Sequence, residues 1–378
     1  MNYESIGKYI HEVDVRNNSQ DCDNLLGVST SKRFIKSVAN TVGTDFSKYK
    51  IVLKNQFAYV PDTSRRGDKI AIALFKGEKA IISSAYTVFE ITDEEKLLPD
   101  YLMLWFNREE FDRYARFKSH GSVREIFDWD SLCETEIKIP PVEEQRRLIN
   151  SYENLKKKVT NIDKSIDVLQ NLCLSIFNDL SSDESNIFHN VEYQNCPLST
   201  IMNFKNGYAF KSSSYVEHGN YNIVTIKNVQ DGYFDNKTFE HIEKLPKNIQ
   251  QHQILKDGDI LLSLTGNVGR TCFCYGNNNL LNQRVALFDT DYKYWCYTLF
   301  LSKDFTRLLI NESGGTAQQN LSTLDILKIS VDIPDKDTLS HFEKVVEPLY
   351  KKIINLYKEK SVLERIVDKY FFKILYEL

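Results

Sequence analysis

The sequence predicts an α+β fold in which one mixed α/β domain occurs twice, each copy followed by a long helix. Three observations lead to this prediction: an internal repeat, strand-rich central segments and two runs of apolar heptads. The 378 residues allow two or three domains, at roughly 100–200 residues per domain. An apolar fraction of 42%, with 12% aromatic residues, is sufficient to build cores.

The internal repeat is clearest where residues 122–140 run in step with residues 316–334, at an offset of 194. In this alignment Ile137 meets Val331 and Pro140 meets Pro334. Apolar pairs further upstream match at offsets of 203 and 199, so the copies differ by loop insertions. A period near 200 is too long for a solenoid and indicates two copies of one domain.

Within each copy, short β-branched and aromatic runs predict strands and a longer amphipathic run predicts a helix. The predicted strands include residues 70–75, 80–83, 87–91, 221–226 and 259–264. The predicted helices of the α/β domains are residues 99–117 and 293–311.

A long helix follows each Ile-Pro step at the end of a domain. Apolar residues recur there at alternating steps of four and three, the pattern of a coiled-coil seam. The predicted pairing residues are Leu155, Val159, Ile162, Ile166, Leu169 and Ile176 in the first helix and Leu349, Ile353, Leu356, Leu363 and Val367 in the second. Lys360 interrupts the second seam, and a polar residue there can set the register. Such helices are expected to pack on each other or, alternatively, on a partner protein.

These elements divide the chain into four segments. Residues 1–141 form the first α/β domain, 142–182 the central helix, 183–335 the second domain and 336–378 the C-terminal helix. The polar run at 181–186 is the linker into the second copy. Each seam covers 26 residues, so each is about 39 Å long at 1.5 Å per residue, which matches about 11 base pairs of DNA.

Signatures of a cofactor enzyme are missing from the sequence. It has no GxxxxGK[ST] loop and no glycine-rich turn that opens a helix. Residues 266–270 are interpreted as a polar loop between two strands. The seven scattered cysteines contain no CxxC pair, which predicts reduced thiols in a cytoplasmic protein. Cys272 and Cys274 are interpreted as core thiols, and no metal site is expected.

Basic residues are unevenly distributed although the net charge is −4. Residues 32–76 hold ten Lys and Arg against three Asp, a local charge of +7 that suits phosphate contacts. Arg65 and Arg66 could also reach guanine edges, and the Asn and Gln clusters of the second copy could read adenine. The candidate DNA-binding residues are Lys32, Arg33, Lys36, Arg65, Arg66, Lys69, Lys118, Arg124, Lys205, Lys211, Lys227, Asn228, Asn267, Arg270, Gln318 and Gln319.

Four motifs make the chain resemble the specificity subunits of type I restriction–modification systems (HsdS-like). The motifs are IPPVEEQRRLI at 139–149, FKNGYAFK at 204–211, LKDGDIL at 255–261 and LNQRV at 281–285. The second helix entry, at 333–339, departs from the pattern because it lacks the Glu-Gln pair.

The resemblance implies a non-catalytic DNA-reading chain. Each α/β domain would be a target-recognition domain for one half of a bipartite site in double-stranded DNA. The two helices would pair as an antiparallel coiled coil, which separates the domains and docks methyltransferase subunits. Those subunits would bring S-adenosylmethionine, and a restriction subunit would use ATP and Mg²⁺.

Two alternatives remain open at the level of sequence. Asp62, Glu94 and Lys96 formally resemble a nuclease pattern, which would make the chain a stand-alone nuclease. The heptads alone would also suit a coiled-coil scaffold with no role in nucleic-acid binding.

Overall fold

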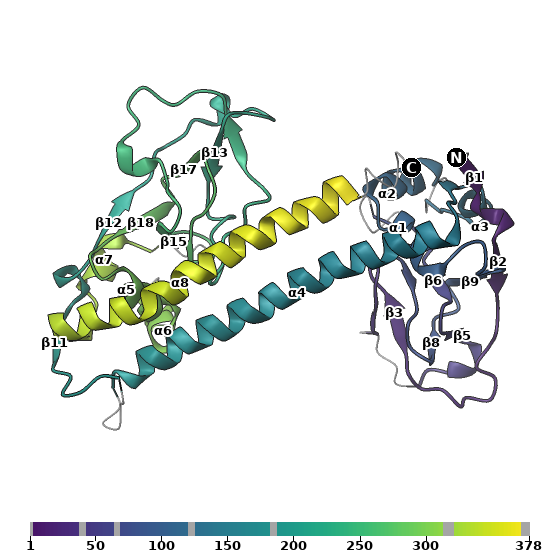
Figure 1. The fold of residues 1–378 in the computed structure, drawn as a ribbon, viewed down its shortest axis with the longest axis horizontal. Coiled ribbons are helices and arrows are strands. Elements are labelled where there is room, and N and C mark those ends of the chain that lie inside the picture. The colour runs from purple at the N-terminus through teal and green to yellow at the C-terminus, as the bar shows by residue number, and fades with distance from the viewer. Residues whose placement is uncertain are drawn as a thin grey trace. The chain divides into compact units, whose positions relative to one another are not determined.

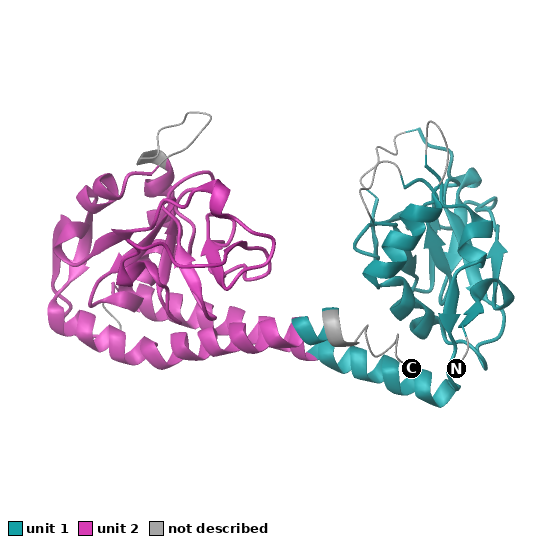
Figure 2. Ribbon diagram, turned by 90° about the horizontal axis from the view of Figure 1, so that it is seen from above, with its two compact units in different colours: residues 1–157, 365–378 teal, residues 158–364 magenta. Residues whose placement is uncertain are grey.

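The computed structural model describes residues 3–37, 43–63, 69–119, 125–181, 187–312 and 321–371. The chain divides into two compact units, one formed by residues 1–157 with 365–378 and the other by residues 158–364 (Figure 2). Both units mix helices and strands, so the coarse α/β prediction is confirmed. No helix within the described ranges is long and apolar enough to cross a membrane.

The first unit is built on a four-stranded antiparallel sheet. Its order is β2 (Ile10–Val13), β9 (Thr87–Ile91), β6 (Phe57–Tyr59) and β7 (Ile72–Leu74). Three strand pairs flank it: β1 (Tyr3–Ser5) with β10 (Glu136–Lys138), β3 (Leu26–Val28) with β4 (Phe34–Lys36), and β5 (Lys50–Leu53) with β8 (Lys79–Ile82). Phe57 and Phe89 stack across neighbouring strands with ring centroids 4.9 Å apart and form the centre of its core.

Three helices contribute to this core: α1 (Pro99–Phe106), α2 (Glu109–Lys118) and α3 (Trp129–Cys133). The single helix predicted over 99–117 is therefore wrong. The chain breaks at Arg108, whose backbone is extended with φ −75° and ψ 144°. This break lets α2 turn Phe111 and Ala115 into the core.

The second unit has the same central topology. Its four-stranded sheet has the order β12 (Asn203–Asn206), β18 (Val285–Asp289), β15 (Ile260–Ser263) and β16 (Thr271–Phe273). A second sheet consists of β14 (Glu240–Ile242), β13 (Tyr221–Val224) and β17 (Asn279–Leu281), and β11 (Tyr193–Pro197) pairs with β19 (Ser330–Pro334). Its helices are α5 (Lys293–Leu301), α6 (Lys303–Glu312) and α7 (Thr323–Lys328), so the single helix predicted over 293–311 is also divided.

The sequence repeat is also a repeat of structure. Helices α5, α6 and α7 begin at residues 293, 303 and 323, each 194 residues after α1, α2 and α3. The two long helices, α4 (Val142–Asp179) and α8 (Lys336–Arg365), keep the same offset. A π-helical segment, Ile366–Phe371, follows α8.

Within the second unit, α4 and α8 contact each other in opposite chain directions (Figure 1). The Phe177 and Phe342 rings meet near one end, with their centroids 6.0 Å apart. Towards the other end, the Lys360 ammonium lies 2.5 Å from the Asp163 carboxylate. The polar residue that interrupts the heptads therefore has a charged partner on the facing helix.

The predicted seam residues lie mostly in the core of this unit. Ile162, Ile166, Ile176, Ile353 and Leu356 are buried in one apolar cluster, and Leu169, Leu349 and Leu363 pack against it half-buried. Leu155 and Val159 are half-buried, and Val367 is buried. Helix α8 also buries Phe342, Val346, Tyr350 and Ile354. Its buried face is therefore wider than a two-helix seam, because α8 packs on α4 and on the α/β part together.

Candidate nucleic-acid interface

Part of the basic stretch of the first unit, four of its ten Lys and Arg residues, is paired with acids that lie elsewhere in the chain. Four of its lysines form ion pairs with acids outside residues 32–76. The pairs are Lys32 with Asp112, Lys50 with Glu12, Lys54 with Glu78 and Lys76 with Asp100. The local charge of +7 therefore overstates the positive surface that DNA would meet.

Lys32 does not reach the surface. Its side chain is 7% exposed, lies 2.9 Å from the Asp112 carboxylate and donates to the Phe106 carbonyl. Burial lowers the pKa of Lys32. A side chain held in this way is not available to a phosphate, so Lys32 is removed from the candidate set.

Six described basic residues of this stretch are exposed at the surface: Arg33, Lys36, Lys48, Lys54, Lys69 and Lys76. Of these, Lys54 and Lys76 form the ion pairs given above. Arg33 and Lys36 belong to the β3–β4 hairpin and its turn. The charge of Lys69 acts on both Lys32 and Asp112, so Lys69 lies near this hairpin. Arg65, Arg66 and Arg124 lie outside the described residues. A basic surface formed by the hairpin and the Lys69 segment stays a prediction.

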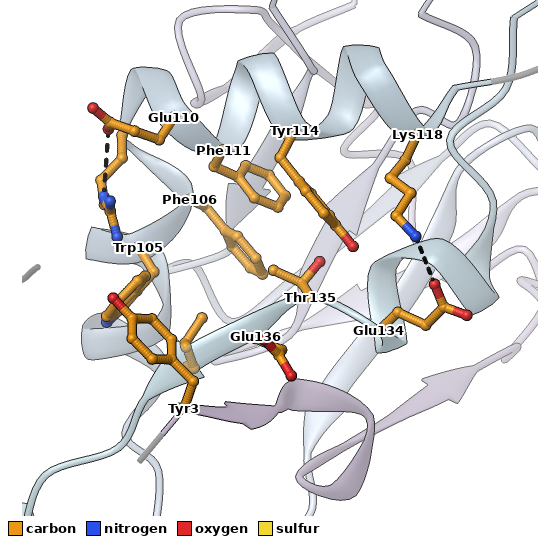
Figure 3. A pocket seen from close by; sticks show the side chains of 12 residues that line it. Tyr3, Trp105, Phe106, Glu110, Phe111, Tyr114, Lys118, Glu134, Thr135 and Glu136 are labelled. Atoms are coloured by element: carbon orange, nitrogen blue, oxygen red, sulfur yellow. Dashed lines mark hydrogen bonds and ion pairs between the residues drawn. The ribbon is translucent and has the colours of Figure 1, made fainter. Parts of the chain in front are cut away.

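Lys118 lies at the edge of an aromatic pocket of about 570 Å³ (Figure 3). Its ammonium is 2.9 Å from the Glu134 carboxylate, which raises the pKa of Lys118. The pocket walls are mostly aromatic and come from Tyr3, Trp105, Phe106, Phe111 and Tyr114. Nothing in the heptads or the charge pattern predicted this pocket, because its walls come from β1, α1 and α2.

Two motifs of the second unit that are far apart in sequence meet in the structure. Gly207 follows β12, and a Cβ atom there would lie 2.2 Å from the Asn282 carbonyl oxygen. The Tyr208 amide donates to the Leu281 carbonyl, and the Gln283 amide donates to the Tyr208 carbonyl. Only glycine permits this approach. The Lys-Asn-Gly and Asn-Gln-Arg clusters therefore form one surface region.

The lysines of this unit differ in their surroundings. Lys205 pairs with Asp289 at 2.7 Å, whereas Lys211 and Lys227 are exposed. Asn228 is fully buried, and its amide donates to the Asp235 and Thr238 carbonyls. Asn228 thus holds a turn together and cannot read a base, so it is also removed from the candidate set.

Residues 266–270 form a loop between β15 and β16, as the sequence predicted. Gly266 and Gly269 have φ of +74° and +81°, and Asn267 between them is exposed. Arg270 is held by Gln230 at 2.5 Å and by Asp231 at 3.8 Å. Gln318 and Gln319 lie outside the described residues. The described candidates of this unit therefore gather on loops next to β12, β13 and β15.

The nuclease pattern is not assembled. Glu94 accepts from Asn55, just before β6, whereas Asp62 lies beyond the other end of that strand and bridges to Ile126. Lys96 pairs with Asp93 instead. In the described part of the chain, no group of three or more His, Cys, Asp or Glu side chains could hold a metal ion.

All seven cysteines are free, and Cys272 and Cys274 are fully buried, as expected of core thiols. Burial raises the pKa of both thiols. Neither is therefore a reactive thiolate.

Near its start, each long helix has a polar side chain that anchors the α/β part beside it. On α4 the fully buried Gln145 accepts from the Leu98 amide and donates to the Lys96 and Pro140 carbonyls. At an offset of 194, α8 has Leu339 in its place. Glu343, one helical turn later, accepts instead from the Tyr294 and Trp295 amides at the start of α5. Glu343 thus ties α8 to the start of α5, as Gln145 ties α4 to the residue before α1.

Comparisons with known proteins agree with the motifs. Residues 190–365 match the model of the type I restriction modification DNA specificity domain. The type I restriction enzyme MjaVIII specificity subunit of Methanocaldococcus jannaschii is 24% identical over 351 residues, or 85% of this chain and 79% of the relative. The MjaIX specificity subunit of the same organism is 22% identical over 307 residues, or 76% and 70%.

A solved structure shares the fold. The crystal structure of the type I restriction–modification system S subunit from M. genitalium has a TM-score of 0.57 at 15% identity, covering 98% of this chain and 94% of that one. The chain is thus similar to type I restriction specificity subunits along most of its length, as the sequence motifs predicted.

Glu343 predicts a specific pH dependence of stability. Burial raises the pKa of Glu343 to about 7, above the ordinary value of 4.5. A raised folded-state pKa contributes stability that is fully present below pH 4.5 and is lost as the pH rises through 7. Lys293, Glu347 and Tyr294 surround this carboxyl group and stay in place in a Glu343→Gln variant.

We expect Glu343→Gln to reduce the loss of unfolding free energy between pH 5 and pH 8 by on the order of 2 kcal/mol. Urea unfolding of the full chain at both pH values measures it, with Glu359→Gln at an exposed position of the same helix as the control. A variant with the pH dependence of the wild type would show that Glu343 does not titrate in this way.

Proposed function

We propose that this chain is the DNA-reading specificity subunit of a type I restriction–modification complex. The observation that carries the proposal is the repeated four-stranded topology, β2–β9–β6–β7 and β12–β18–β15–β16, in a chain whose two long helices run antiparallel. Two copies of one domain in one chain suit a target with two separate parts. The family match and the relatives with this printed name support it.

In this proposal each α/β domain is a target-recognition domain that reads one half of a bipartite site in double-stranded DNA. The paired helices act as an antiparallel coiled-coil spacer and as the docking element for methyltransferase subunits. Methylation with S-adenosylmethionine and cleavage with ATP and Mg²⁺ take place on the methyltransferase and restriction subunits. The chain itself contributes sequence recognition, and no catalytic step is assigned to it.

The first unit would hold its half-site through the β3–β4 hairpin. Arg33 and Lys36 are exposed there, and Lys69 lies nearby. The second unit would use the loops around Gly207, Lys227 and Asn267, which mix positive charge with amides. Phosphate contacts supply affinity, and amide and guanidinium contacts to base edges supply specificity.

The proposal predicts which residues control salt dependence. Arg33→Ala with Lys36→Ala should lower the slope of log affinity against log salt by about 2, because each lost phosphate contact removes about one unit. Lys32→Met should leave that slope unchanged. Because Lys32→Met removes the ion-pair partner of the buried Asp112 carboxylate, this variant should instead destabilise the chain by about 3 kcal/mol.

Fluorescence anisotropy with cognate duplex DNA and thermal melting measure the two effects separately. The comparison is direct because Lys32 and Arg33 are neighbours in the chain. A slope that falls equally in both variants would contradict the assignment of Arg33 and Lys36 to the DNA surface.

The function itself is tested by selection from random duplex DNA, using the chain together with its methyltransferase subunits. We expect enrichment of a two-part motif with a fixed gap of unspecified bases. Recovery of a single uninterrupted motif, or of no motif, would contradict the proposal.

A further inference from the structure

A polar junction in the second unit joins both long helices to one loop of the α/β part. The Gly232 carbonyl accepts from Tyr357 of α8 at 2.9 Å and from Gln170 of α4 at 3.2 Å. Gln170 also donates to the Tyr357 hydroxyl at 3.3 Å. One carbonyl group thus fixes the loop to two helices at a single point.

Further contacts extend the junction along α8. Asn236 donates to the buried Ser361 hydroxyl at 2.7 Å, and Lys237 lies 2.9 Å from the Glu364 carboxylate. The Tyr357 ring stacks on Tyr275 with an interplanar angle of 7°. Gly232 is also tied to the sheet, because its amide donates to the Thr271 carbonyl of β16. The loop is therefore held on both sides.

The same loop carries candidate DNA-contacting residues. Gln230 and Asp231, next to Gly232, hold Arg270 of the β15–β16 loop. Gln230 also donates to the carbonyl of the exposed Lys227. A displacement of the junction would therefore move Lys227 and Arg270 with it.

We propose that this junction, formed by Gln170, Tyr357, Gly232, Asn236–Ser361 and Lys237–Glu364, is a specificity-determining element that sets the gap between the two half-sites. It deepens the proposed function and rests on it. The residues of the junction need not contact a base. They position the second set of recognition loops on the helix pair, and that position selects the gap length.

The geometry of DNA makes this selection strict. One additional base pair moves a half-site by about 3.4 Å along the helix axis and turns it by about 35°, since a turn takes about 10–10.5 base pairs. Hydrogen bonds at 2.7–3.2 Å do not survive a shift of that size. An intact junction therefore opposes sites whose gap is longer or shorter by one base pair.

The test measures gap lengths in a library that contains both half-sites separated by variable numbers of random bases. We expect Gln170→Ala with Tyr357→Phe to keep both half-site sequences. The share of sites with a gap altered by one base pair should rise about tenfold, because the lost hydrogen bonds no longer oppose the shift. Val168→Ala, on the exposed side of α4, is the matched control and should keep the wild-type gap distribution.

A charge reversal tests the same claim at the surface, where folding is little affected. Lys237→Glu should broaden the gap distribution, and Lys237→Glu with Glu364→Lys should narrow it again, because the pair is restored in the opposite sense. Circular dichroism establishes that each variant is folded.

The two proposals fail in different ways. A wild-type complex that enriches no two-part site overturns the proposed function and this inference with it. A wild-type complex with a defined gap, together with folded Gln170→Ala/Tyr357→Phe and Lys237→Glu variants that keep that gap distribution, overturns this inference alone.

Discussion

The buried face of α8 is the constraint on which the second unit depends. Side chains along this face contact two different partners: Phe342 and Lys360 meet α4, whereas Glu343 and Tyr357 meet the α/β part. A helix that buries so wide a face cannot rotate or slide without exposing apolar surface to water. The packing of α8 therefore holds the α/β part of the second unit on the helix pair, and the polar junction at Gly232 fixes one of its loops there.

Polar groups within this apolar packing fix the register of the two long helices and their contacts with the α/β parts. The Lys360–Asp163 pair interrupts a continuous apolar seam, and a polar position of this kind favours one register over its neighbours. Glu343 accepts hydrogen bonds from backbone amides at the start of α5, and Gln145 accepts one from the Leu98 amide just before α1. In both units a side chain of the long helix satisfies backbone groups of the α/β part that would otherwise be buried without partners.

Much of the fold could be predicted from the sequence, because periodicity and repetition are local properties. The offset of 194 and the heptads of the long helices needed no knowledge of tertiary contacts. The break at Arg108 was missed, because the apolar pattern continues through it and only the packing of Phe111 requires a turn. Glu343 was missed because its partners at 294 and 295 lie about 50 residues away in the chain.

The candidate interface was predicted less well, for a related reason. Local charge counts ignore partners distant in sequence, so Lys32 was assigned to DNA although Asp112, 80 residues later, neutralises it in the interior. Asn228 was assigned as a base reader although its amide is used within its own turn. The residues that survive are those whose side chains are exposed, such as Arg33, Lys36, Lys211 and Lys227.

In the proposed function, the helix pair measures the gap between two half-sites. A direct measurement uses a chain in which residues 151–157 of α4 and residues 358–364 of α8 are each duplicated, so that both helices gain one heptad and keep their pairing. Seven residues add about 10 Å of helix, which corresponds to about three base pairs. If the helix pair sets the gap, selection recovers the same two half-sites with a gap longer by about three base pairs. Recovery of both half-sites at the original gap would contradict it.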